Sequence, residues 1–295
     1  MLLSEFRKKG MSALAPLYPE AEAAGILSML CAHRLGIRSY THIIEPGYEI
    51  MPEDKPLLEE DLRRLASGEP VQYVLGVSEF CGRMFRVNPA VLIPRPETEI
   101  LCREAVAALS GVPHPAVIDL CTGSGNIAWT VALSVPGASV VGVDLSAEAL
   151  DVARSQPFGE GPVFLQADIL LPPPAELEAE RFDLLLSNPP YVMESEKARM
   201  RRNVLSYEPA SALFVPDTDP LVFYRAVADW AERLLKPGGT FMVEINESLG
   251  LTAKALFADR GFCKLKIIRD FYEKDRFVAG EKVGGSQTPL SVGTD

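Results

Sequence analysis

The chain has 295 residues, of which 47% are hydrophobic and 23% are charged, a balance typical of globular proteins with room for two domains. Its formal charge of −11 at pH 7 argues against a stable nucleic-acid partner, because duplex-binding enzymes gather Lys and Arg on one face. A basic run at Lys197 to Arg202 stands among glutamates, so we interpret it as a solvated loop.

The numbers and spacing of cysteine and histidine residues argue against a disulfide-stabilised or metal-binding protein. The five cysteines are far apart and include no C-x-x-C pair, which fits neither a disulfide framework nor a zinc cluster. The three histidines are too scattered to hold a metal. No apolar stretch reaches the ~20 residues of a membrane helix, and the charged first ten residues do not resemble a signal peptide. We therefore expect a cytoplasmic monomer with no bound metal and no membrane association.

The first 70 residues read as a small helical domain. Apolar residues at helical spacing predict one helix over 21–35 and a second over 55–66. Gly36 and Gly68 come after these segments as stop signals. Because this part holds no cluster of catalytic side chains, we expect it to dock or support a substrate.

The pattern changes to short β-prone pieces between Val71 and Ile93. Asn88-Pro89 provides a turn, and Pro94 and Pro96 interrupt the segment after Ile93. We therefore predict a β-hairpin linker over residues 71–96.

Residues 97–280 alternate between helical and strand patterns. Short apolar strands separated by helices predict an α/β domain with a mostly parallel, seven-stranded sheet covered on both faces. The expected helices are 97–109, 126–134, 220–235, one capped by Ser146 that runs to about Arg154, and one that ends at Gly261. The expected strands are 117–120, 140–143, 163–167, 182–187, 240–245, 264–269 and 276–279. The polar tail, 281–295, is expected to be disordered.

A glycine-rich loop, Asp119-Leu120-Cys121-Thr122-Gly123-Ser124-Gly125, joins the first strand of this domain to its helix. Glycines allow the sharp turn and the close approach of a ligand to backbone amides. Asp144 ends the second strand, where a carboxylate can accept hydrogen bonds from both hydroxyls of a ribose. The sequence therefore predicts a nucleotide-like cofactor at the carboxyl ends of the strands.

The loop alone does not choose the cofactor, since Gly123, Gly125 and Ala128 also satisfy a loose dinucleotide fingerprint typical of NAD enzymes. Two carboxylates favour S-adenosylmethionine. Asp119 precedes the loop, where it could reach the cationic methionine end of that cofactor, and Asp168 ends the third strand, where the adenine would lie.

The most specific local feature is Asn188-Pro189-Pro190-Tyr191 at the end of the fourth strand. Two prolines fix the backbone and remove N–H donors, so the turn presents carbonyl oxygens. Asn188 adds a side-chain acceptor, and Tyr191 adds an aromatic face. Two acceptors beside an aromatic wall suit a planar NH₂ group, which can belong to an amide or to a nucleobase. The tetrapeptide therefore predicts methylation of a planar nitrogen.

Longer stretches resemble the release-factor glutamine methyltransferases, the PrmC/HemK type, over about residues 20–280. These stretches are Gly68-Glu69-Pro70-Val71-Gln72-Tyr73, Leu92-Ile93-Pro94-Arg95-Pro96-Glu97-Thr98-Glu99, Tyr207-Glu208-Pro209 and the pair Asp270 and Arg276. The resemblance implies a Rossmann-like class I methyltransferase fold, with residues 97–280 as the methyltransferase domain. It implies as substrate the glutamine of a Gly-Gly-Gln loop in peptide-chain release factors, docked by the N-terminal domain. An amino-methyltransferase that acts on DNA or RNA is the alternative, since such enzymes share the tetrapeptide.

The same resemblance implies the site residues. S-adenosylmethionine would lie against Asp119, Cys121, Thr122, Gly123, Ser124, Gly125, Asp144, Asp168, Ile169 and Asn188, and the glutamine against Asn188, Pro189, Pro190 and Tyr191. For Arg95 and Glu97, a linker salt bridge and a functional role remain equally open.

Two positions depart from the family pattern. The family usually has glycine where Cys121 stands, and a cysteine with positive φ would be strained, so we expect an ordinary φ there. The family also tends to place glycine shortly after the acid of the fifth strand, where this chain has Glu244-Ile245-Asn246. Asparagine tolerates left-handed backbone better than most residues, so this change is the milder one.

Overall fold

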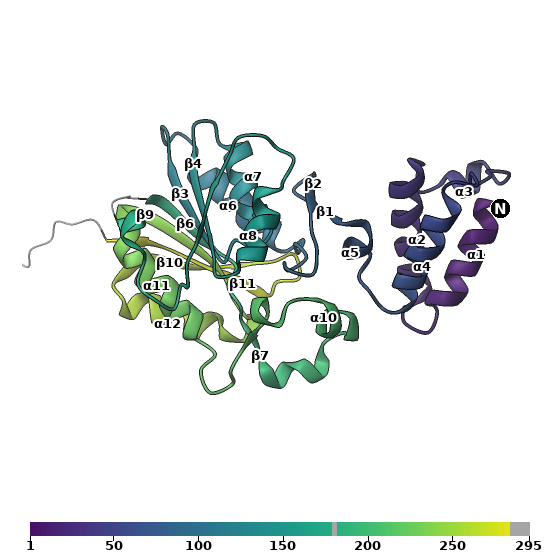
Figure 1. The fold of residues 1–295 in the computed structure, drawn as a ribbon. Helices are drawn as coiled ribbons and strands as arrows, with labels where there is room; N and C mark the ends of the chain where they lie inside the picture. The colour runs from purple at the N-terminus through teal and green to yellow at the C-terminus, as the bar shows by residue number, and fades with distance from the viewer. Residues whose placement is uncertain (179–181, 284–295) are drawn as a thin grey trace, which may run out of the picture. The chain divides into compact units, whose positions relative to one another are not determined.

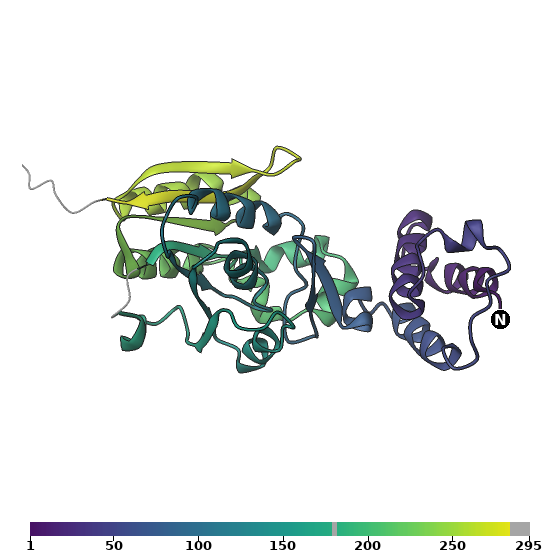
Figure 2. The ribbon, with the colours of Figure 1, turned by 90° about the horizontal axis from the view of Figure 1, so that it is seen from above.

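The computed structural model describes residues 1–178 and 182–283, which divide into two compact units. The N-terminal unit comprises residues 1–78, 87–89 and 200–208. The second unit comprises the rest of the described chain, so the predicted linker at 71–96 is shared between the two units. Figures 1 and 2 show the elements of each unit.

Helices build the N-terminal unit. They are α1 (Leu3–Leu14), α2 (Glu20–Leu35), α3 (Thr41–Ile44), α4 (Lys55–Ala66), α5 (Val71–Leu75) and α10 (Arg202–Tyr207). The two predicted helices are confirmed as α2, which Gly36 ends with a φ of +64°, and α4, which has a proline in its first turn. Their apolar faces meet in one core that includes Phe6, Leu27 and Leu58.

The expected β structure was wrong for Val71–Leu75, which is helical. Val71 and Val74 are buried in the core of the N-terminal unit, so packing overrides their β propensity, and Gly76 ends the helix with a φ of +75°. The hairpin itself is confirmed as β1 (Val77–Phe80) and β2 (Arg83–Arg86), with Cys81 and Gly82 at positive φ in its turn.

The basic run at 197–202 was interpreted as a loop, but it is largely helical. It spans the end of the 3₁₀ helix η1 (Glu194–Arg199) and the start of α10. Two of its cations have acidic partners: Lys197 pairs with Glu194, and Arg201 pairs with Glu22 within the N-terminal unit.

A seven-stranded sheet forms the centre of the second unit, with the strand order β10-β11-β9-β6-β3-β4-β5. The strands are β3 (Ala116–Leu120), β4 (Ser139–Asp144), β5 (Val163–Gln166), β6 (Phe182–Ser187), β9 (Leu235–Glu244), β10 (Phe262–Arg269) and β11 (Asp275–Lys282). Strands β9, β6, β3, β4 and β5 pair in parallel, and β11 runs antiparallel to both of its neighbours. The predicted mostly parallel sheet is confirmed.

Helices cover both faces of this sheet because successive strand side chains point to opposite sides. On β6, Leu184 and Leu186 join one core with α6 (Thr98–Ala108), α7 (Asn126–Ser134) and α8 (Ala147–Arg154). Leu185 joins a second core with α11 (Val222–Leu234) and α12 (Gly250–Asp259). The short elements of this unit are α9 (Ala175–Glu178), β7 (Val192–Met193), η2 (Ala210–Ala212), β8 (Phe214–Val215) and η3 (Glu247–Leu249).

The order of the sheet reverses at β3, which pairs with β4 on one side and with β6 on the other. The carboxyl ends of β3, β4 and β6 therefore meet at one edge, where ligands bind in open α/β sheets. The glycine loop comes directly after β3, Asp144 ends β4 and Asn188 comes directly after β6.

Several boundaries differ from expectation; β10, for example, begins at Phe262 rather than at residue 264. Strand β9 begins at Leu235 rather than at residue 240, because the glycine turn lies inside an irregular register with β6. Strand β11 continues to Lys282, so the predicted tail cannot begin at 281, and the remainder of that tail, 284–295, lies outside the described residues. Within the described chain no helix has the length and apolarity needed to cross a membrane.

Candidate active site

The loop from β3 to α7 has an unusual backbone. Cys121, Gly123 and Gly125 all have positive φ, at +59°, +54° and +77°. At Gly125 a Cβ atom would also lie 3.0 Å from Trp129 and 3.1 Å from Ala153 and Phe164. Glycine is therefore required at 125 for both its conformation and its lack of a side chain.

Asp119 lies behind this loop rather than in the cavity. Its side chain is fully buried, and its Oδ2 accepts hydrogen bonds from the Thr122 hydroxyl at 2.6 Å and from the Ala128 amide at 3.2 Å. Burial raises the pKa of this carboxyl to about 7. Oδ1 has no hydrogen-bond partner among the described residues, so a cationic ligand nearby would be favourable. Asp119 thus holds the loop directly and can act on a ligand only through its charge.

Asp144 does line the cavity, as expected. Its Oδ2 accepts from the Gly123 amide at 2.8 Å and its Oδ1 from the Ser146 amide at 2.9 Å. A carboxylate has about four lone-pair sites, so each oxygen retains one for a ligand hydroxyl. The two acceptor oxygens of Asp144 therefore suit the two neighbouring hydroxyls of a ribose.

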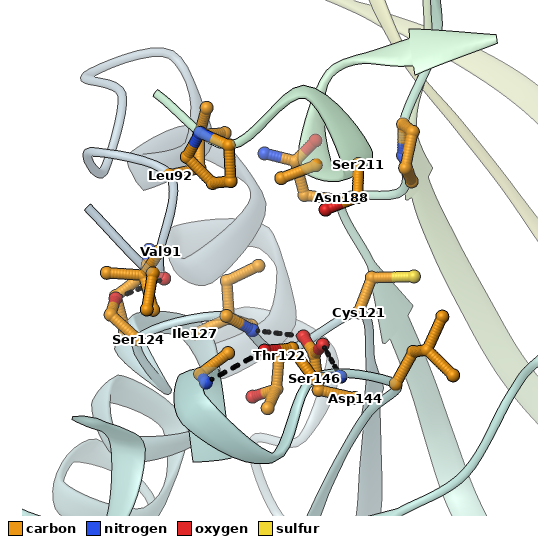
Figure 3. Close-up of a pocket in the computed structure, with 18 of the residues that line it drawn as sticks. Val91, Leu92, Cys121, Thr122, Ser124, Ile127, Asp144, Ser146, Asn188 and Ser211 are labelled. Carbon is orange, nitrogen blue, oxygen red and sulfur yellow. Dashed lines mark hydrogen bonds between the residues drawn. The ribbon is translucent and has the colours of Figure 1, made fainter. Parts of the chain in front are cut away.

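Figure 3 shows the cavity between the glycine loop and Asn188. It contains about 1010 Å³ of free space including its open mouth. The predicted residues that line it are Cys121, Thr122, Gly123, Ser124, Asp144, Asp168, Ile169, Asn188 and Pro190. Asp168 accepts from the Leu170 amide at 2.9 Å, which fixes its carboxylate at the end of β5. Among the described residues no cluster of His, Cys, Asp and Glu suits a metal ion.

The tetrapeptide divides between the cavity and the protein interior. Asn188 and Pro190 line the cavity, whereas Asp119, Gly125, Pro189 and Tyr191 do not. Tyr191 directs its hydroxyl to Glu244 Oε1 at 3.0 Å, and burial raises its pKa well above the usual range. The expected contact between the Tyr191 ring and a substrate therefore stays a prediction.

Sequence reasoning missed several side chains of the site. Thr98 lines the cavity and accepts a hydrogen bond from Asn188 Nδ2 at 3.3 Å. Arg95, for which the sequence had left a functional role open, also lines the cavity, whereas Glu97 stands at the N-cap of α6. Thr98 and Arg95 both belong to the run from Ile93 to Glu99. The density of charged and hydroxyl residues in this run was the signal in the sequence that could have indicated a functional site. Leu145, Ser146, Ser211 and Phe223 line the cavity without any such signal.

The expectation of an ordinary φ at Cys121 was wrong, since its φ is +59°. The hydrogen bond from Thr122 N to Val143 O at 2.9 Å and that from Gly125 N to Thr122 O at 2.8 Å fix the turn on both sides. The loop therefore imposes the left-handed conformation on the cysteine, at a cost of about 1–2 kcal/mol. Asn246, by contrast, has a φ of −62° and needs no left-handed tolerance.

We expect Cys121→Gly to be more stable than Cys121→Ala by about 1 kcal/mol, because both remove the thiol and only glycine is free of left-handed strain. Urea unfolding of the two variants measures this difference. The control is the same two substitutions at Cys263, which lies in strand β10 and does not have a positive φ. There Cys263→Ala should be more stable than Cys263→Gly. Equal stability of the two Cys121 variants would contradict backbone strain at this position.

Comparison with known proteins decides the family. A model of the PrmC N-terminal domain matches residues 5–76, and a methyltransferase domain model matches 113–268. The release factor glutamine methyltransferase of Bacteroides thetaiotaomicron is 36% identical, over 92% of this chain and 96% of its own. That of Bordetella pertussis is 37% identical, over 90% and 96%. The chain belongs to the release factor glutamine methyltransferase family. The S-adenosylmethionine-dependent enzyme class follows from this membership, and the NAD interpretation of the loop is set aside.

Two solved structures are similar to this chain. The release factor-specific protein-(glutamine-N5) methyltransferase of Alicyclobacillus acidocaldarius is 30% identical, covers 68% of this chain and 99% of its own, and has a TM-score of 0.43. The 16S rRNA N2 G1207 methyltransferase of Thermus thermophilus, in complex with AdoMet and guanosine, is 20% identical. It covers 70% of this chain and 49% of its own with a TM-score of 0.51, a likeness of fold alone.

Proposed function

We propose that this chain transfers a methyl group from S-adenosylmethionine to the side-chain amide nitrogen of the glutamine in the Gly-Gly-Gln loop of peptide-chain release factors. The main structural support is that Asn188 Nδ2 donates its hydrogen bond to Thr98, which leaves Asn188 Oδ1 available to a ligand in the cavity. Family membership supplies the identity of the substrate.

S-adenosylmethionine, when bound, supplies an electrophilic methyl group. Asp144 would hold its ribose hydroxyls, the amides of the glycine loop would face it, and Asp168 with Ile169 would flank its base. The unpartnered Oδ1 of Asp119 favours its cationic end through charge. These residues bind and orient the cofactor.

The tetrapeptide would hold the substrate amide. An amide NH₂ is a poor nucleophile because its lone pair is delocalised, and its two N–H bonds diverge in one plane. Asn188 Oδ1 and the Pro189 carbonyl would accept from these two bonds and keep the nitrogen in position. Near-attack positioning can contribute ~7–11 kcal/mol, which makes it the main catalytic device. The nitrogen becomes acidic as it gains its methyl group and releases a proton to water, so no general base is required.

The N-terminal unit would dock the release factor. Its match to the PrmC N-terminal domain supports this role. It also carries exposed apolar side chains around α3, where Ile43 is 69% exposed, Ile44 59% and Met51 55%. Such a cluster suits a protein partner better than bulk water.

The test is mass spectrometry of a release factor that is co-expressed with this chain. We expect a gain of one methyl group on the glutamine of the Gly-Gly-Gln loop. The matched control is the same release factor with that glutamine replaced by alanine, which should gain nothing. Transfer of a labelled methyl group to duplex DNA or RNA, with none to the release factor, would overturn the proposal in favour of a nucleobase amino-methyltransferase.

A further inference from the structure

A buried hydrogen-bond network starts at Thr98, which lines the cavity and holds Asn188, and continues to Glu244, which does not line the cavity. Thr98, in the first turn of α6, and Glu244, the last residue of β9, are each 1% exposed. The Thr98 hydroxyl donates to Glu244 Oε2 at 2.7 Å, and the Tyr191 hydroxyl donates to Glu244 Oε1 at 3.0 Å. One carboxylate therefore contacts groups from two separate segments of the site.

The direction of these hydrogen bonds fixes the orientation of the Asn188 amide. A hydroxyl has one proton, and that of Thr98 is donated to the Glu244 carboxylate, so toward Asn188 the hydroxyl can only accept. The amide must therefore turn its NH₂ to Thr98, as the 3.3 Å distance to Nδ2 records. Asn188 Oδ1 then has no partner among the described residues and remains available as an acceptor.

We infer that Thr98 and Glu244 are positioning residues, which keep Asn188 Oδ1 directed at the substrate NH₂ by allowing Thr98 only to accept from Asn188. This inference rests on the proposed role of Asn188. In this role Thr98 and Glu244 act through Asn188 rather than on the reacting atoms. They select one of two amide orientations that have the same shape and opposite hydrogen-bonding character.

The charge state of Glu244 decides which orientation is selected. Burial raises the pKa of Glu244, while the bonds from Thr98 and Tyr191 and the charge of Arg276 act in the opposite direction. Arg276 is shared with Asp270 at 2.8 Å, and Glu97 also raises the pKa of Glu244. A protonated Glu244 can donate to Thr98, which can then donate to Asn188 Oδ1 and reverse the amide. The network therefore works only with an ionised Glu244.

The test compares Thr98→Val, which keeps the shape and removes the hydroxyl, with Thr98→Ser, which keeps the hydroxyl. We expect Thr98→Val to lower kcat by about 10- to 100-fold with cofactor affinity unchanged, and Thr98→Ser to retain most of the turnover. Thr130→Val is the matched control, because Thr130 is also buried, its hydroxyl donates to the Asn126 carbonyl at 2.6 Å, and it is not among the residues that line the cavity. It should change stability without changing kcat.

A second readout does not depend on the substrate. The ¹⁵N–¹H signals of the Asn188 side-chain amide, assigned by their loss in Asn188→Ser, should shift in Thr98→Val and stay in place in Thr130→Val. In the wild type, kcat should fall as the pH is lowered and Glu244 becomes protonated. Glu244→Gln should have a low kcat that does not fall further in this acidic range. Unchanged Asn188 signals in Thr98→Val would overturn the inference. An inactive wild type with shifted signals would instead overturn only the proposed function.

Discussion

Replacing Asn188 with alanine is expected to lower kcat for methyl transfer by about 100- to 1000-fold, the effect of removing one aimed hydrogen bond from a preorganised site. Asn188 lines the cavity and offers its Oδ1 to the substrate, while Thr98 holds its Nδ2. The loss should appear in kcat because the acceptor acts on the reacting nitrogen. Single-turnover transfer to a purified release factor measures it.

Cofactor affinity separates this role from a structural one. Binding of S-adenosylmethionine to Asn188→Ala, followed by calorimetry, should stay close to that of the wild type, because Asp144 and the glycine loop are intact. Asn203→Ala is the matched control: its Oδ1 bonds the adjacent Val204 amide on α10, away from the cavity lining. Equal losses of turnover and cofactor affinity in Asn188→Ala would mean that Asn188 is a structural residue.

Replacing Asp144 with alanine is expected to weaken cofactor binding by about 10- to 100-fold. A hydrogen bond to a charged group contributes about 1.5–3 kcal/mol, and alanine offers none to a ribose hydroxyl. The variant also releases the Gly123 and Ser146 amides, which Asp144 holds at 2.8 and 2.9 Å, so the loop loses part of its preorganisation. Calorimetric titration with S-adenosylmethionine gives the dissociation constant.

Asp151→Ala makes the matched comparison for Asp144→Ala. It removes the same charge from the neighbouring helix α8, where the Asp151 side chain is 79% exposed and pairs with Arg154. Its cofactor affinity should match that of the wild type. A similar decrease in both variants would indicate that net charge, rather than contact with the cofactor, governs affinity.

Much of the fold could be predicted from local patterns. The helix at 55–66 and the strand at 182–187 have the bounds expected from their periodicity, since an amphipathic helix and a buried strand leave different spacings of apolar residues. The wrong prediction of β structure at Val71–Leu75 arises because tertiary packing overrides the local pattern. Its β-branched residues suggest a strand, but their burial in the N-terminal core selects a helix.

The site was predictable to the extent that its residues are adjacent in the chain. The glycine loop and the Asn188 tetrapeptide are contiguous motifs whose residue types state their chemistry. Thr98 and Glu244 are 146 positions apart, and only the sheet brings their side chains to 2.7 Å. No spacing rule could have paired them.

By itself the sequence determined the alternating α/β architecture, the cofactor loop and the acceptor chemistry of Asn188, because each depends on neighbouring residues. Only the tertiary structure decided that Asp119 lies behind the loop, that Cys121 has a φ of +59° and that a buried carboxylate orients the Asn188 amide. These outcomes depend on which segments meet at the carboxyl edge of the sheet. The free-energy cost of an unpaired polar atom depends on how deeply it is buried, and packing across the whole domain determines that burial.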